Sequence, residues 1–121
     1  MYEIYFYKDR SGKEPVLEYL KELSQKKDKS SRIKFDKIND YIQALSVYGV
    51  AIGEPYIKHL SGDIWELRPL RDRILFVAWD KNGFVLLHHF MKKTQKTPIR
   101  EIEKAKREVA DLKERGVEHE S

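Results

Sequence analysis

The sequence predicts a single α+β domain with the order β-α-α-β-β-β-α, a small, mostly antiparallel sheet and helices packed on one face. Apolar residues recur at helical spacing through the first half of the chain and again near its end. From Ile64 the pattern changes to short apolar runs that are typical of strands. An Asn-Gly pair separates two of these runs, which indicates a hairpin and therefore antiparallel neighbours.

The first element is expected to be a strand over residues 2–7, because YEIYFY is rich in aromatic and β-favouring residues. The first helix is expected to begin near Pro15, since proline suits the first helical position. Its apolar stripe consists of Val16, Tyr19, Leu20 and Leu23. After a polar connection, Ser30 or Ser31 can cap a second helix that ends at Gly49. Its apolar face consists of Phe35, Ile38, Ile42 and Leu45.

Three strands are expected next, over residues 64–67, 73–79 and 84–90, with the last two joined by the turn DKNG. Thr97-Pro98 then opens a final helix that ends at Gly116. Its buried face consists of Ile99, Ile102, Ala105, Val109 and Leu112. The domain is therefore expected to span residues 1–121, with residues 116–121 as a frayed tail.

The composition excludes several classes of protein and of functional site. There are no cysteines, which excludes disulfides, thiolate zinc sites and cysteine nucleophiles. No apolar run approaches the roughly 18–20 residues that cross a bilayer, and the first residues do not resemble a signal peptide. We therefore expect a cytoplasmic protein that does not contact a membrane. The isoelectric point near 9.2 favours an anionic partner.

Positive charge is concentrated where the last strand gives way to the final helix. Residues 84–107 carry +5, whereas the whole chain carries +4. Lys92, Lys93 and Lys96 surround the expected start of this helix, and a helix N-terminus favours phosphate. The alternative is an ordinary solvated helix start.

Alternation along the strands places Arg68 and Arg73 on one face of the sheet, which we expect to be uncovered and open to solvent. Arg71 adds to the charge there. The alternative is that these are ordinary surface arginines.

His88 and His89 are neighbours in a strand, so they point to opposite faces and cannot both bind one metal ion. One is expected to be a core histidine, and the other can act as an acid or base.

No Gly-rich phosphate loop, metalloprotease motif or pair of catalytic carboxylates is present, so no metal or cofactor is expected.

The segment IWELRPLRDRILFVAWDKNGFVLLHHFMKKTQKTPIREIEKAKRE resembles the RelE/HigB superfamily of bacterial toxins, in particular its phage-derived, HigB-like branch. The motif residues are Trp65, Glu66, Leu67, Arg68, Arg73, His88, Phe90, Lys92, Lys93, Thr97 and Pro98.

The resemblance implies a toxin that cleaves mRNA without a metal, usually on the translating ribosome, and so inhibits translation. It also implies neutralisation by a cognate antitoxin, a HigA-like helix-turn-helix protein. In this reading the catalytic residues are Arg68, Arg73, His88 and Lys93, with the arginines clamping phosphate. The RNA-binding residues are Arg71, Phe90, Lys92 and Lys96.

The sequence departs from RelE at one position. RelE has a tyrosine beyond its last strand that stacks on RNA and assists catalysis, whereas Phe90 and Met91 occupy that neighbourhood here. Phe90 can stack on a base but cannot transfer a proton. Two alternatives therefore stay open: a ParE-like protein that poisons gyrase, and a non-catalytic module that binds nucleic acid or an antitoxin.

Overall fold

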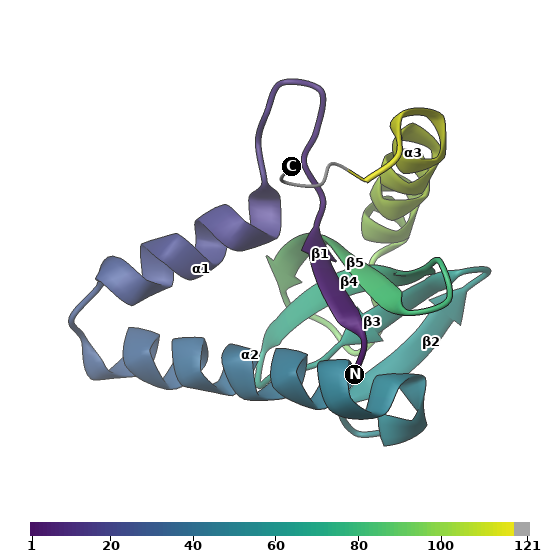
Figure 1. Ribbon diagram of the computed structural model, residues 1–121. Helices are drawn as coiled ribbons and strands as arrows, with labels where there is room; N and C mark the ends of the chain where they lie inside the picture. The colour runs from purple at the N-terminus through teal and green to yellow at the C-terminus, as the bar shows by residue number, and fades with distance from the viewer. Residues whose placement is uncertain (118–121) are drawn as a thin grey trace.

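Five strands and three α-helices make up residues 1–117, the part of the chain that the computed structural model describes (Figure 1). The α+β class is confirmed, with the order β-α-α-β-β-β-β-α. No helix in this range is long and apolar enough to cross a bilayer. The elements are β1 (Glu3–Phe6), α1 (Pro15–Gln25), α2 (Lys29–Tyr48), the 3-10 helix η1 (Gly49–Ile52), β2 (Ile57–Ser61), β3 (Ile64–Leu67), β4 (Asp72–Trp79), β5 (Gly83–Met91) and α3 (Ile99–Arg115).

The strands form one sheet in the order β1-β5-β4-β3-β2. The pairs β2–β3, β3–β4 and β4–β5 are antiparallel, and β1 is parallel to β5. The hairpin predicted from the Asn-Gly pair joins β4 to β5, and Trp79 pairs with Gly83 at its end. The sheet is therefore mixed but mostly antiparallel, as predicted.

Strand β2 was not predicted from the sequence. It lies at the edge of the sheet, where only Ile57 is fully buried while Lys58 and His59 are exposed. An edge strand needs few apolar residues because much of it faces water, so its sequence pattern is weak.

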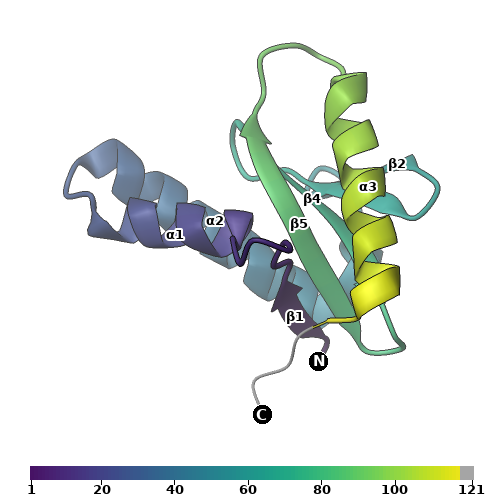
Figure 2. The same cartoon turned by 90° about the horizontal axis from the view of Figure 1, so that it is seen from above.

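The prediction that helices cover only one face of the sheet was wrong. Figure 2 shows α1 and α2 on one side of β5 and β4, and α3 on the other. Ile74 and Phe76 of β4 pack in the cluster with α1 and α2, whereas Leu75 and Val77 pack with α3. The unbroken apolar run ILFV in β4 carried this information, since a strand buried on both faces does not alternate.

The helix boundaries were predicted well, with one exception. Helix α1 begins at Pro15, and α2 ends before Gly49, whose φ of 63° is a conformation that glycine adopts readily. The cap of α2 is Asp28 rather than Ser30 or Ser31, and its carboxylate accepts a hydrogen bond from the Ser31 N–H at 2.9 Å.

The predicted frayed tail lies only partly within the described range. Val117 is half-buried and packs against the cluster beneath α3. Residues 118–121 lie outside the described residues.

Candidate functional site

A basic cavity lies at the end of the sheet where the turn between β3 and β4 meets the loop between β5 and α3. The cavity itself has a volume of only about 10 Å³, room for about one water molecule, and it adjoins a groove of about 470 Å³ that shares Arg73, Lys92 and Lys93 with it and also reaches Arg71. The residues that line the cavity are Glu66, Arg73, Phe90, Lys92, Lys93, Thr94, Gln95, Lys96, Thr97 and Pro98. Three strands and one loop therefore contribute to a single concave site.

Arg73 lies near the start of β4 and is only 6% exposed, so its predicted place on an open, solvated face was wrong. Its Nη1 donates hydrogen bonds to the carbonyl oxygens of Leu70 and Asp72, both at 2.9 Å. Burial lowers the pKa of the Arg73 guanidinium below its ordinary value. Helix α3 covers this face of the sheet, and the guanidinium is held against the turn that precedes its own strand. Arg73 is also among the residues that line the cavity.

Glu66 on β3 provides a buried carboxylate at the centre of the site, with 2% of the residue exposed. Its Oε1 lies 3.6 Å from Nε of Arg68 and 3.9 Å from Nε of Arg73. Its Oε2 accepts a hydrogen bond from the Thr97 hydroxyl at 2.5 Å. Arg68 and Arg73 therefore share one face of the sheet, as predicted, and a carboxylate links them to the loop before α3.

Sequence reasoning did not place Glu66 or Thr97 in the functional set, although both belong to the motif. A signal was available for Glu66, because strand alternation puts it on the same face as Arg68. Glu66 and Thr97 are 31 residues apart in the sequence, and no local sequence pattern predicts a contact between residues so far apart.

The lysine loop, residues 92–97, is held to the β3–β4 turn by backbone contacts. The Lys92 N–H donates to the Arg71 carbonyl at 2.8 Å, and Nη2 of Arg71 donates to the Lys92 carbonyl at 3.1 Å. Lys93 and Lys96 are exposed, and no carboxylate in residues 1–117 lies within 4 Å of either ammonium group. These cations are therefore available to an anion that binds at this surface.

His88 lies outside this cavity. It is 1% exposed beneath α3, where Nδ1 is 2.6 Å from Oε1 of Glu108 and Nε2 is 3.0 Å from Oε1 of Glu101. A neutral imidazole has only one N–H, so two carboxylate contacts require either an imidazolium or a protonated carboxyl group. The residue therefore joins β5 to α3, and no group that lines the cavity depends on its proton in this geometry.

His89 points to the opposite face, as predicted, and stacks on Tyr19 of α1 with ring centroids 3.6 Å apart and 13° between the planes. The Tyr19 hydroxyl donates to Oδ1 of the buried Asp72 at 2.8 Å. Burial lowers the pKa of His89 below its ordinary value of 6.5. On this face of the sheet, Tyr19 of α1 therefore contacts Asp72, the first residue of β4.

The structure brings together seven of the eight predicted site residues. Arg73, Phe90 and the three lysines line the cavity, Arg71 lines the adjoining groove, and Arg68 contacts Glu66. No group of three or more His, Cys, Asp or Glu side chains within residues 1–117 is arranged to hold a metal ion.

Comparison with protein families matches residues 16–110 to the family described as "Phage derived protein Gp49-like (DUF891)". The matched region runs from α1 into α3 and contains every residue of the site described above. No curated protein gives a significant match to the chain.

Proposed function

Because this chain belongs to the phage-derived Gp49-like family of RelE/HigB-like toxins, we propose that it is the toxin of a type II toxin–antitoxin pair and cleaves mRNA. Family membership supports a toxin in general. The assignment to RNA cleavage rests on the cavity and the groove beside it, both of which are lined by Arg73, Lys92 and Lys93.

The proposed reaction is attack of an RNA 2′-hydroxyl on the adjacent phosphorus. The bond from the 2′-oxygen to phosphorus forms, the bond to the 5′-oxygen breaks, and a 2′,3′-cyclic phosphate and a 5′-hydroxyl result. The transition state carries extra negative charge on the phosphate oxygens, and preorganised cations stabilise that charge. Arg73 is suited to this role because contacts with its own turn hold its guanidinium in place.

Two protons must move in this reaction. Glu66 is the only carboxylate among the described residues that line the cavity, so we assign it to accept the proton of the 2′-hydroxyl. Lys93 is exposed at the rim and is assigned to donate a proton to the leaving 5′-oxygen. His88 is not assigned as the acid or base; it holds β5 against α3, since both of its nitrogens face carboxylates of α3.

Phe90 and the remaining lysines are proposed to bind the substrate. Phe90 is half-buried and lines the cavity, and the exposed part of its ring is proposed to stack on one base at the cavity's edge. Lys92 and Lys96 lie on the same loop and are suited to the flanking phosphates, and Arg71 extends this surface into the groove.

The family implies an antitoxin partner, and we propose a HigA-like helix-turn-helix protein encoded beside the toxin. An acidic segment of that protein would neutralise the unpaired cations of the lysine loop. Co-expression with the adjacent gene should therefore give a stable complex. Failure of the two proteins to co-purify at both low and high salt would contradict this pairing.

The experiment that tests the proposed function is induction of the protein alone, followed by mapping of mRNA 5′ ends in ribosome fractions. New 5′ ends within coding regions, together with arrested protein synthesis, support the proposal. Intact mRNA with continuing translation in arrested cells would indicate a gyrase poison instead. Normal growth with soluble, folded protein would indicate a binding module without catalytic activity.

A further inference from the structure

A second basic region lies at the turn between α1 and α2, far along the chain from the lysine loop. We call residues 21–37 the hairpin tip; they comprise the end of α1, the connection and the start of α2. Seven of these 17 residues are Lys or Arg and three are Asp or Glu, which gives a net charge of +4. Since residues 84–107 carry +5 and the chain carries +4, the rest of the protein sums to −5. Positive charge is therefore divided between two separate regions.

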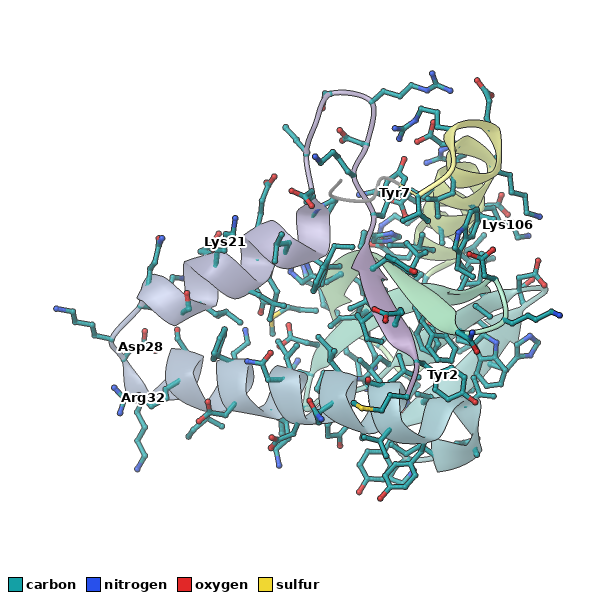
Figure 3. All side chains as sticks on the ribbon, viewed as in Figure 1. Tyr2, Tyr7, Lys21, Asp28, Arg32 and Lys106 are labelled. Atoms are coloured by element: carbon teal, nitrogen blue, oxygen red, sulfur yellow. The ribbon has the colours of Figure 1, made fainter. Side chains whose placement is uncertain are left out.

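The hairpin tip projects away from the sheet. Figures 1 and 2 both show the α1–α2 turn extending beyond the strands, on the side opposite to α3. Figure 3 shows Lys21, Asp28 and Arg32 along this projecting end. Lys34 anchors its base, because its ammonium lies 3.9 Å from Oδ2 of the buried Asp72 at the start of β4. The tip is therefore held in a defined position relative to the candidate site.

Within residues 1–117, most cations of the tip have no carboxylate partner. Lys26 lies 3.7 Å from Glu22, and the Asp28 carboxylate is engaged in capping α2. Four further side chains are exposed, and in the described part of the chain no carboxylate lies within 4 Å of their charged groups. These are Lys21, Lys27, Lys29 and Arg32. Their mutual repulsion is relieved by a polyanion that meets several of them at once.

The tip offers charge without apolar or aromatic anchors. Leu23 is 3% exposed and Phe35 is half-buried, so Ile33 is the one large apolar side chain in residues 21–37 that is exposed. A protein partner needs buried apolar anchors for most of its affinity, and a membrane-surface helix needs an apolar face. Binding of single-stranded RNA relies on aromatic rings that stack on bases, and no ring in residues 21–37 is exposed. A regular array of phosphates is the ligand that these exposed side chains still fit.

We propose that the hairpin tip binds the sugar–phosphate backbone of double-helical RNA, as a site separate from the cavity. Duplex RNA is recognised mainly through its shape and its phosphates, which suits a projecting cluster of cations. The choice of RNA over DNA rests on the proposed function, whereas recognition of phosphate rests on the tip alone. The groove beside the cavity would hold the strand to be cleaved while the tip contacts a neighbouring folded RNA.

The test compares two full-length variants that each lose three positive charges. The tip variant is Lys27→Gln, Lys29→Gln and Arg32→Gln. The matched control is Lys104→Gln, Arg107→Gln and Lys113→Gln, all exposed positions on α3. Binding of a blunt-ended RNA duplex of about 16 base pairs, and of a DNA duplex of equal length, is measured by fluorescence anisotropy. Salt is varied from about 50 to 200 mM.

The tip variant is expected to bind the RNA duplex at least about tenfold more weakly, with a salt slope lower by about 2 to 3. The control is expected to keep most of the affinity, and both variants should cleave a short single-stranded RNA as the wild type does. Equal losses in the two variants would show that only net charge matters, which overturns the proposal. Absence of duplex RNA binding by the wild type, or tighter binding of the DNA duplex, would also overturn it. The single-strand cleavage assay separates these outcomes from a failure of the proposed function.

Discussion

The hydroxyl of Thr97 donates a hydrogen bond to the buried carboxylate of Glu66 at 2.5 Å. This contact joins the loop before α3 to strand β3, and the other oxygen of the carboxylate lies within 4 Å of Arg68 and Arg73. One acidic group therefore joins the loop that carries the lysines to Arg68 and Arg73. The geometry of the proposed active site depends on this junction.

Replacing Thr97 should loosen the lysine loop. Thr97→Val keeps the shape of the side chain but removes the donor to a buried carboxylate, so we expect a loss of about 1–3 kcal/mol in the free energy of unfolding. Thr97→Ser should recover most of this loss because it retains the hydroxyl. Urea unfolding of the three proteins checks the expectation. Equal stability of the valine and wild-type proteins would mean that this hydrogen bond contributes little.

Removing the charge of Glu66 should affect catalysis more than binding. Glu66→Gln still accepts a hydrogen bond from Thr97 but is far less basic, and loss of a general base typically lowers the rate about 100- to 10,000-fold. The dissociation constant for a substrate analogue that lacks the attacking 2′-hydroxyl should change little. If single-turnover cleavage by the folded glutamine variant matches the wild type, Glu66 is not the proton acceptor.

His88 is expected to stabilise the contact between β5 and α3 rather than to take part in the reaction. His88→Gln removes the ring that both Glu101 and Glu108 contact, and leaving a buried polar group without its partner typically costs about 1–3 kcal/mol. Adding Glu101→Gln and Glu108→Gln removes the unpaired charge and should restore much of the stability. Cleavage should recover with the fold in this triple variant. A stable triple variant that cannot cleave RNA would return His88 to the catalytic set.

Stability should fall as the solution becomes mildly acidic, partly because of His89. Burial lowers the pKa of His89 in the folded protein, so the unfolded chain takes up a proton first as the pH falls below about 6.5. The contribution of the neutral ring is therefore complete above this pH and decreases below it. His89→Phe, which can still stack on Tyr19, should show a smaller decrease in Tm between about pH 7.5 and 5.5. Parallel Tm curves for the two proteins would contradict this assignment.

Most of the fold was predictable from the sequence because its signals are local. Pro15 at the start of α1, Gly49 after α2 and the Asn-Gly pair in the hairpin each act through backbone conformation over a few residues. The edge strand β2 was missed because a half-solvated strand carries few apolar residues.

The sequence predicted that most of the candidate site residues lie close together, but it did not predict the burial and contacts of Arg73 and His88. The lysines of the loop and the two arginines lie together, yet Arg73 is buried and His88 is enclosed by α3. Both errors have one cause, which is that the position of α3 depends on packing between residues far apart in the sequence. The continuous apolar run in β4 was the available sign that a helix covers each face.

The most direct test of the proposed RNA cleavage uses purified wild type and Arg73→Lys with mRNA bound to translating ribosomes. The lysine variant keeps a positive charge but loses the guanidinium that contacts the Leu70 and Asp72 carbonyls, so we expect roughly 100- to 1000-fold slower cleavage. The wild type should release fragments with 5′-hydroxyl ends and 2′,3′-cyclic phosphates. Intact mRNA with the folded wild type, or equal rates for the two proteins, would contradict the account.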